Sequence, residues 1–336
     1  MELKAGPNDA GRRLDRVLRK SLPDYSLSLI HRLLRQGKVA VNGIPAHPDD
    51  RVTAMSIIRL EANAASSVNH IKPRINKNAD SNVNCRPGRV YRDGLLVNCR
   101  CQRINKEGGS VLLPEILMRE AGIIIFNKPP GLASHGKDSL DALVKNWLAD
   151  KIPPSLSFKP GPLHRLDRPS SGIIAFSESL EGARWFSRLL RERKVVKTYL
   201  AIAEGHIAGD ELWRDDLVRN KNAQKTLAGN KTEKSKNAIT TVKPLASNGS
   251  CTLIEARIIT GRTHQIRAQA ASHGHPLAGD RKYGALPFPG GFCLHAWKME
   301  LCEQIEGFPQ PLTAPLPEAF LTRIQTLFHT TKSQNN

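Results

Sequence analysis

The apolar residues at the start of the chain recur at helical spacing. Over residues 12–20 they line one face, and the other faces are basic. A second helical pattern over residues 29–35 follows Ser26 or Ser28, either of which can cap it, and stops at Gly37. The pattern predicts two short helices with basic outer surfaces.

A small hairpin is predicted directly after these helices. Lys38–Val41 reads as a strand, and Asn42-Gly43 is a strong tight-turn pair. The return strand is expected within Arg51–Leu60. Helices and hairpin together make a first module over residues 1–60.

The next stretch, residues 61–112, lacks this periodicity. It is rich in Asn, Lys, Arg and Ser, which indicates a linker or insertion that is partly disordered. Cys85, Cys99 and Cys101 fall here, without the paired Cys-x-x-Cys units of zinc modules. No metal site is therefore expected, and a polar tail is expected at residues 329–336.

The second module is predicted over residues 113–328. Its first half alternates buried strands with amphipathic helices. The expected strands are 123–126, 173–176 and 194–203, and the expected helices are 139–148 and 179–190. Residues 208–250 are polar and lysine-rich, and beyond a strand at 240–242 their order does not follow from the pattern. Further strands are expected at 252–256 and 293–297, and 260–269 turns from a strand end into a helix.

Charge narrows the choice of partner. The 336 residues carry a formal net charge of +19, which favours a polyanion and above all nucleic acid, because neutralised phosphates release counterions. An anionic membrane surface is the alternative, but no amphipathic anchor and no apolar run of about 20 residues is found. With six scattered cysteines and no apolar signal core at the N-terminus, a cytoplasmic location is expected.

The candidate chemistry centres on one acid. Asp167 lies between Arg165 and Arg168, next to His164 and just ahead of the strand 173–176. Neighbouring cations favour the charged form of a carboxylate, which can then act as a nucleophile. A structural ion pair at this position is the plainer interpretation.

Three further motifs change that balance. They are Asn127-Lys128-Pro129, Lys197-Thr198-Tyr199 and Gly261-Arg262-Thr263-His264-Gln265-Ile266-Arg267. With His164-Arg165-Leu166-Asp167, their order and spacing resemble the pseudouridine synthases of the large-ribosomal-RNA type. The opening Arg-Leu-Asp-Arg-Val-Leu, the Arg-Gln-Gly-Lys-Val helix exit and the Val-Asn-Gly turn resemble an S4 RNA-binding domain.

The resemblance implies a fold and a reaction. The fold is α+β, with a mixed, mostly antiparallel central sheet flanked by helices, and a small N-terminal α/β S4-like domain. The reaction breaks the C1′–N1 bond of a uridine in RNA, turns the base and rejoins it through C5, without metal or organic cofactor. Ribosomal RNA is the favoured partner, with transfer RNA as the second candidate, and the protein is expected to be a monomer.

The resemblance also assigns roles to residues. Asp167 becomes the catalytic aspartate, by attack at the ribose or pyrimidine or by promoting deprotonation. Tyr199 stacks on the target base, Arg262 pairs with the aspartate, and Ile266 packs beside the base. The residues expected to contact RNA are Arg165, His164, Arg12, Arg13, Arg16, Arg32, Arg35 and Lys38.

Other interpretations stay open at this point. A non-catalytic RNA-binding protein of the same fold would share the basic surface, although it should lack Asp167, Tyr199 or Arg262. A metal hydrolase would need ligands in a fixed shell, and the candidate histidines are His264, His273, His275 and His295. A glycoside hydrolase would need two carboxylates beside the bond, and one acid stands in a strong motif. The sequence also departs from the resemblance in its long 61–112 stretch and in Met118–Gly122, where acidic residues are expected.

Overall fold

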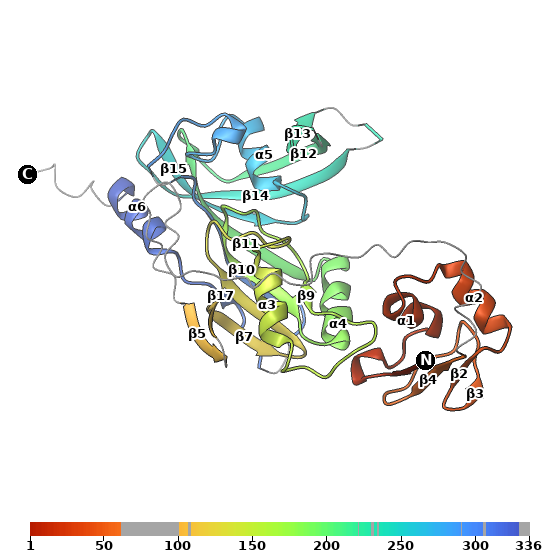
Figure 1. The fold of residues 1–336 in the computed structure, drawn as a ribbon. Helices are drawn as coiled ribbons and strands as arrows, with labels where there is room; N and C mark the ends of the chain where they lie inside the picture. The colour runs from red at the N-terminus through yellow and green to blue at the C-terminus, as the bar shows by residue number, and fades with distance from the viewer. Residues whose placement is uncertain are drawn as a thin grey trace, which may run out of the picture. The chain divides into compact units, whose positions relative to one another are not determined.

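The computed structural model describes residues 1–61, 101–106, 109–220, 222–229, 232–233, 235–289, 291–304 and 307–328. These residues form two compact units (Figure 1). Residues 1–61 build the first unit together with the short segments 148–159 and 179–181. The other described residues build the second unit.

The first unit holds two helices and a four-stranded antiparallel sheet, in the order β1-β4-β2-β3. Its elements are β1 (Glu2–Lys4), α1 (Leu14–Ser21), α2 (Leu27–Arg35), β2 (Val39–Val41), β3 (Ile44–Pro45) and β4 (Ile57–Leu60). The apolar faces of α1 and α2 pack on the sheet, and leucines such as Leu14, Leu18 and Leu33 are almost fully buried.

Local signals in the sequence account for most of this unit. The Ser26 hydroxyl accepts a hydrogen bond from the Leu29 N–H at 3.2 Å, which caps α2. Asn42 and Gly43 both adopt positive φ, as a tight hairpin turn requires. The expected return strand is shorter than predicted, since β4 begins at Ile57 and pairs with β2 on one side, while Ile44–Pro45 pairs with β2 on the other. The three-residue strand β1 has too little pattern to be predicted.

One buried carboxylate ties the first unit together. Asp9 is 0 % exposed and accepts hydrogen bonds from five groups of its own unit: the Gly6, Leu156 and Ser157 N–H groups and the Ser155 and Ser157 hydroxyls. Burial acts to raise the Asp9 pKa, but these hydrogen bonds outweigh it and lower the pKa. The segment 148–159 is thereby held by an ionised side chain.

Part of the stretch predicted as a linker or insertion forms strands. β5 (Cys101–Lys106) and β6 (Gly109–Pro114) form an antiparallel hairpin, and the bounds of the linker or insertion stay a prediction. The expectations for residues 62–100, including Cys85 and Cys99, lie outside the described residues.

The second unit is organised around an eleven-stranded sheet in the order β13-β12-β14-β15-β11-β16-β10-β8-β7, with β17 on β16 and β9 on β10. Only the described pair β10–β16 is parallel, so the predicted mixed, mostly antiparallel sheet is confirmed. The strands are β7 (Ile116–Glu120), β8 (Ile123–Lys128), β9 (Gly161–Pro162), β10 (Ser171–Ser177), β11 (Val195–Glu204), β12 (Glu211–Asn220), β13 (Lys225–Gly229), β14 (Lys236–Ser247), β15 (Cys251–Ile258), β16 (Leu294–Leu301) and β17 (Leu312–Thr313). The helices are α3 (Leu140–Leu148), α4 (Leu180–Arg191), α5 (Gln265–Ser272) and α6 (Glu318–Phe328).

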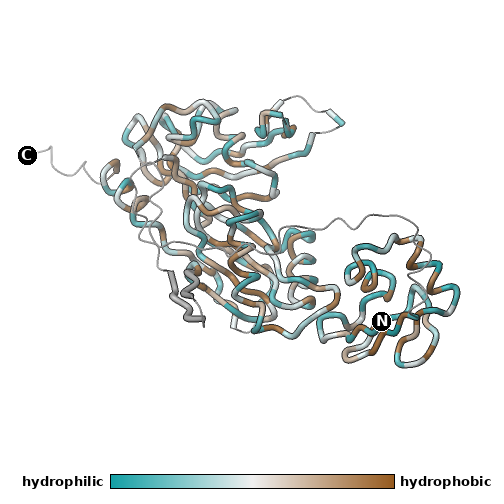
Figure 2. Tube along the Cα trace, viewed as in Figure 1, coloured by the Kyte–Doolittle hydropathy of each residue, from teal (hydrophilic) through white to brown (hydrophobic). Residues whose placement is uncertain are grey.

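Side-chain alternation along β11 separates the two faces of the sheet. Leu200 and Ile202 pack in one cluster with Phe320 of α6. Tyr199 has the opposite parity and therefore faces the other side. In Figure 2 the hydrophobic segments gather along the strands in the middle of this unit. The outer strands β12–β14 carry polar residues on their exposed face, which explains why their order was hard to predict.

No helix in the described part of the chain has both the length and the apolar character needed to cross a bilayer.

Candidate active site

The loop that carries Asp167 runs from β9 to β10 and is fixed at several points. The Ser134 hydroxyl donates to the Leu166 carbonyl at 2.8 Å and accepts from the Leu166 N–H at 3.1 Å. The Arg168 Nε donates to the Gly131 carbonyl at 2.9 Å. Arg168 therefore stabilises the loop and is not the ion-pair partner of Asp167. A side chain on such a loop keeps its position.

Lys128 stabilises the same loop through hydrogen bonds to backbone carbonyls. It is 0 % exposed, and its Nζ donates to the Pro129, Leu132 and Arg168 carbonyls at 2.9, 2.8 and 3.3 Å. Burial lowers the Lys128 pKa to about 7, against the opposing charge of Asp167. The Asn127-Lys128-Pro129 motif therefore stabilises the loop that carries the candidate catalytic residue.

A glycine lets β10 approach β16 closely at the end of the loop. Gly172 has a φ of +104°, and an added Cβ would lie 2.2 Å from the Ala296 carbonyl oxygen. Only glycine fits both the conformation and the contact. The parallel pairing of β10 with β16 begins at Ser171 and Gly172, four residues beyond Asp167.

The second part of the site is the start of α5. His264 adopts the left-handed conformation just before the helix. The buried Gln265 accepts hydrogen bonds from the Thr260 hydroxyl and the Arg262 N–H, and it donates to the Ile239 carbonyl of β14. This anchoring sets which side chains of the first helical turn face Asp167.

Arg267 is the cation that pairs with Asp167. Its Nη1 lies 2.9 Å from the Asp167 Oδ2, and its Nε and Nη2 lie 2.6 and 2.8 Å from the two carboxylate oxygens of Asp280. The Arg267 side chain is 6 % exposed. Burial acts to lower the Arg267 pKa, but Asp280 and Asp167 outweigh it and raise the pKa. One arginine thus connects two carboxylates.

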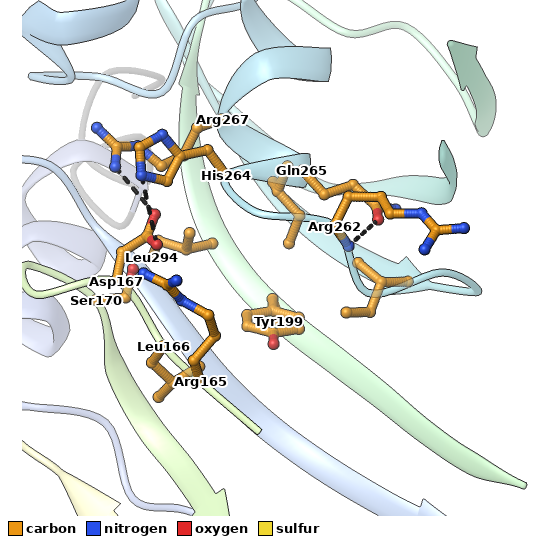
Figure 3. A pocket seen from close by; sticks show the side chains of 12 residues that line it. Arg165, Leu166, Asp167, Ser170, Tyr199, Arg262, His264, Gln265, Arg267 and Leu294 are labelled. Atoms are coloured by element: carbon orange, nitrogen blue, oxygen red, sulfur yellow. Dashed lines mark hydrogen bonds and ion pairs between the residues drawn. The ribbon is translucent and has the colours of Figure 1, made fainter. Parts of the chain in front are cut away.

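The expectation that Arg262 pairs with Asp167 was wrong. The Arg262 Nε donates to the Asn237 carbonyl at 3.1 Å, and Figure 3 shows its side chain turned away from Asp167. The reason lies in the helix start: residue 262 precedes α5, whereas Arg267 lies on its first turn and faces the Asp167 loop.

A pocket opens beside Asp167, with an empty volume of about 390 Å³ including open solvent. Tyr199 lines this pocket (Figure 3) and is 6 % exposed. Burial and then the Asp167 charge raise the Tyr199 pKa, so its hydroxyl is a neutral donor at neutral pH. The lining residues are Arg165, Leu166, Asp167, Ser170, Tyr199, Ile258, Arg262, His264, Gln265, Ile266, Arg267 and Leu294.

Two family models and several known proteins are similar to this chain. Residues 122–272 match the family model of RNA pseudouridylate synthases, and residues 12–58 match the S4 domain. The ribosomal large subunit pseudouridine synthase D of Neisseria meningitidis serogroup A is 30 % identical over 331 residues, covering 92 % of this chain and 77 % of the relative.

This chain belongs to the RNA pseudouridylate synthase family.

A second relative and a solved structure extend the comparison. The ribosomal large subunit pseudouridine synthase C of Escherichia coli K12 is 27 % identical, covering 95 % of this chain and 94 % of the relative. The structure of human RNA pseudouridylate synthase domain containing 4 is 24 % identical with a TM-score of 0.51, covering 62 % of this chain and 91 % of that chain, and it supports the fold. The pseudouridylate synthase described here isomerises uridine in RNA, and the N-terminal module is an S4 domain.

The other predicted site residues of this pseudouridylate synthase fall into two groups. Ile266 is 4 % exposed and lines the pocket, and the exposed Arg165 lies at the same pocket. The His164 ring stacks on Phe186 and its Nε2 accepts from the Ala175 N–H, and contact of His164 with RNA stays a prediction. Burial and then the Lys197 charge lower the His164 pKa to about 3, so it stays neutral.

The basic residues of the S4 domain also differ among themselves. Arg13 lies 2.9 Å from Asp15 and 2.5 Å from Asp49, so its charge is compensated within the domain. Arg12 donates to the Ser157 carbonyl at 3.4 Å. Arg16, Arg32 and Arg35 are exposed and Lys38 is half-buried.

The histidines considered as metal ligands have separate partners. His273 contacts Asp215, His275 contacts the Glu204 carbonyl, and His295 contacts the Ser171 hydroxyl and the Ala314 carbonyl. Within the residues that the structure describes, no three His, Cys, Asp or Glu side chains come together in a metal-binding group.

Asp280 and Tyr283 are site residues that sequence reasoning missed. Asp280 is 2 % exposed and Tyr283 is 6 % exposed. They follow α5, in a segment to which the sequence analysis assigned no role. The available signal was an acidic residue, Asp280, that follows two glycines shortly after the arginine-bearing helix.

Proposed function

We propose that this pseudouridylate synthase modifies uridines of large-subunit ribosomal RNA and that Asp167 is its catalytic residue. The observation that carries the assignment of Asp167 is the pairing of its carboxylate with Arg267 at the pocket that Tyr199 lines. The names of the relatives, which concern the ribosomal large subunit, support the choice of RNA.

The burial of Asp167 dictates how substrate must arrive. Its side chain is only 12 % exposed, so a base stacked inside a helix is out of reach. The target nucleotide must be extruded into the pocket. There the Tyr199 ring offers a stacking surface, an interaction worth about 1–3 kcal/mol per base.

The side chains around Asp167 then divide the work. Arg267 holds Oδ2 and stabilises the charged carboxylate, which acts either by attack at the ribose or pyrimidine or by promoting deprotonation. Tyr199 remains a neutral donor, and Arg165 at the pocket edge meets the RNA around the extruded nucleotide. The reaction is balanced within the substrate: the C1′–N1 bond breaks, the C1′–C5 bond forms, and the C5 proton leaves as N1 gains one.

We assign RNA backbone contact to four cations of the S4 domain, Arg16, Arg32, Arg35 and Lys38, which form no ion pair with the residues that the structure describes. Replacing Arg32, Arg35 and Lys38 by Gln should weaken RNA binding and reduce the slope of log K against log salt by about two. Arg13→Gln is the matched control, because Arg13 is already paired with acids. An unchanged slope in the triple variant would remove this surface from the interface.

The direct test uses unmodified transcripts of large-subunit ribosomal RNA, small-subunit ribosomal RNA and transfer RNA, each incubated with the protein in chelator and mapped for pseudouridine. We expect new pseudouridine in the large-subunit transcript alone. Modification confined to transfer RNA would refute the choice of substrate.

The role of Asp167 is tested separately with Asp167→Asn. We expect no turnover with nearly unchanged RNA affinity, since the amide keeps the shape of the carboxylate. Full activity of this variant would exclude Asp167 from the chemistry. Action as a monomer in the cytoplasm stays a prediction.

A further inference from the structure

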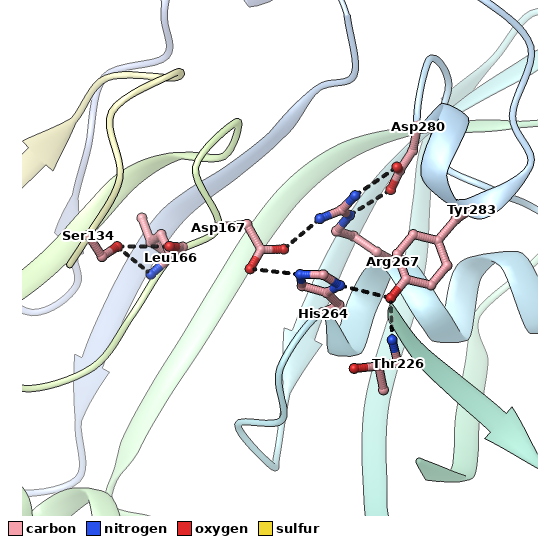
Figure 4. A network of polar contacts seen from close by, with 8 residues as sticks. All are labelled: Ser134, Leu166, Asp167, Thr226, His264, Arg267, Asp280 and Tyr283. Carbon is pink, nitrogen blue, oxygen red and sulfur yellow. Dashed lines mark hydrogen bonds and ion pairs between the residues drawn. The ribbon is translucent and has the colours of Figure 1, made fainter. Parts of the chain in front are cut away.

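A second side chain approaches Asp167 at the carboxylate oxygen that Arg267 does not contact. The His264 Nε2 lies 3.6 Å from the Asp167 Oδ1. Its Nδ1 lies 2.9 Å from the Tyr283 hydroxyl, which in turn accepts from the Thr226 N–H of β13 at 3.0 Å. Figure 4 shows these groups joined by successive contacts, from the backbone of β13 to the carboxylate.

The line of contacts selects one tautomer of His264. A neutral imidazole carries its proton on either Nδ1 or Nε2. If Nδ1 carried it, the Nε2 lone pair would face the Asp167 carboxylate, and two acceptors would repel each other. With the proton on Nε2, the ring presents N–H to Asp167 and Nδ1 accepts from the Tyr283 hydroxyl. Since the Thr226 N–H already supplies a donor to that hydroxyl oxygen, the hydroxyl proton is free to point at Nδ1.

The ring is also expected to be neutral. Burial, the largest cause, lowers the His264 pKa, the Asp167 charge opposes this, and the Arg267 charge adds to it. A neutral ring makes the position of its single proton decisive, because the other nitrogen then offers only a lone pair.

We propose that Tyr283 fixes His264 in the Nε2–H tautomer and that this N–H holds the Oδ1 of Asp167 when uridine occupies the pocket. The distance of 3.6 Å is too long for a hydrogen bond in the free protein, and such contacts commonly shorten when substrate binds. His264 is thus a positioning residue that acts through Asp167, complementary to Arg267 on Oδ2. This role rests on the proposed catalytic function of Asp167.

The chain offers variants that isolate this role. His264→Gln can place an amide N–H near the former Nε2, whereas His264→Asn reaches only the former Nδ1. Asparagine tolerates the left-handed conformation of residue 264, whose φ is 53°, so a defect of the Asn variant does not come from the backbone. Tyr283→Phe removes the hydroxyl and keeps the ring over which the Arg267 guanidinium lies at 5.0 Å.

The kinetic test measures single-turnover pseudouridine formation and RNA affinity for these variants. We expect His264→Asn to lower the rate by roughly ten- to a hundredfold, the effect of one hydrogen bond to a charged group, with RNA affinity unchanged. His264→Gln should recover most of that loss, and Tyr283→Phe should fall between the two. Equal losses in the Gln and Asn variants would overturn the proposal.

The structural test needs neither RNA nor activity. ¹⁵N NMR of histidine-labelled protein, with the His264 signals identified by their absence from His264→Gln, reports which nitrogen carries the proton. We expect the Nε2–H form in the wild type and a mixture of tautomers in Tyr283→Phe. A wild-type Nδ1–H form would overturn the proposal, whereas failure of the proposed function would appear separately as activity of Asp167→Asn.

Discussion

Replacing each of the two arginines of one motif in turn gives the sharpest test of the site. Arg267 connects Asp167 to Asp280, whereas Arg262 contacts the Asn237 carbonyl. Arg267→Met removes the cation and keeps an unbranched chain of similar length. Arg262→Gln is the matched control, taken from the same sequence motif and lining the same pocket.

The size of the effect follows from burial. Asp280 is 2 % exposed, and in Arg267→Met it would be left without the cation that it contacts through two hydrogen bonds. Breaking a buried pair from one side costs about 3–5 kcal/mol of unfolding free energy. Asp167 would also lose the contact that fixes Oδ2, and misplacement of a catalytic group by about 1 Å can cost a hundredfold in rate.

Stability and catalysis can be separated with a second substitution. Asp280→Asn in the Arg267→Met background removes the unpaired buried charge and should recover part of the unfolding free energy. It should not recover the rate, because Asp167 still lacks its cation. Urea unfolding gives the stability, and tritium release from RNA labelled at uridine C5 gives the single-turnover rate.

The contrast between the two arginines decides the question. We expect Arg262→Gln to change stability by less than about 1 kcal/mol, as is usual for a partly exposed side chain with one backbone contact, and to keep its rate within about tenfold. If Arg262→Gln lost as much rate as Arg267→Met, the pairing seen here would not be the one used in catalysis.

Three further predictions concern other parts of the chain. Asp9→Asn should lower the free energy of unfolding at neutral pH. Because the Asp9 pKa in the folded protein lies below the unfolded value near 3.8, the stability that the ionised carboxylate contributes is present above pH 3.8 and is lost as the pH falls through the folded pKa. The urea unfolding curves of wild type and variant should therefore converge in acid. Gly172→Ala should cost about 3 kcal/mol or more in thermal unfolding, because its Cβ meets the Ala296 carbonyl oxygen at positive φ, while Gly209→Ala, with nothing within 4 Å, should be nearly neutral. Tyr199→Phe should keep RNA affinity and the shape of the pH–rate profile between pH 6 and 9, because the Tyr199 hydroxyl stays protonated there; a lost alkaline limb would show that it titrates in the reaction.

The architecture was predictable where local signals and core patterns agree. The helices α1 and α2 follow from an apolar stripe, a serine cap and a terminal glycine, and β8 and β10 from uninterrupted apolar runs. β12, β13 and most of β14 were not predicted from the sequence, since their burial alternates weakly and each depends on neighbouring strands for its hydrogen bonds. β1 and β3 are too short to carry a period.

The site shows a different limit. The motifs around Asp167, Tyr199 and Arg267 are all visible in the sequence, yet spacing alone does not say which of two arginines five residues apart faces the carboxylate. The answer depends on where α5 begins, and that is fixed by Gln265 through hydrogen bonds to Thr260 and to β14.

Once α5 begins at Gln265, its first turn directs Arg267 to the Asp167 loop, and the exit of the helix brings Asp280 to the other side of the same guanidinium. His264, the residue just before the helix, then reaches the second oxygen of Asp167. Sequence motifs therefore indicated the proposed catalytic residue, while its partners Arg267 and His264 are placed by the start of α5. His164 belongs to the same motif as Asp167, but its ring packs on Phe186 of α4 and accepts from the Ala175 N–H of β10.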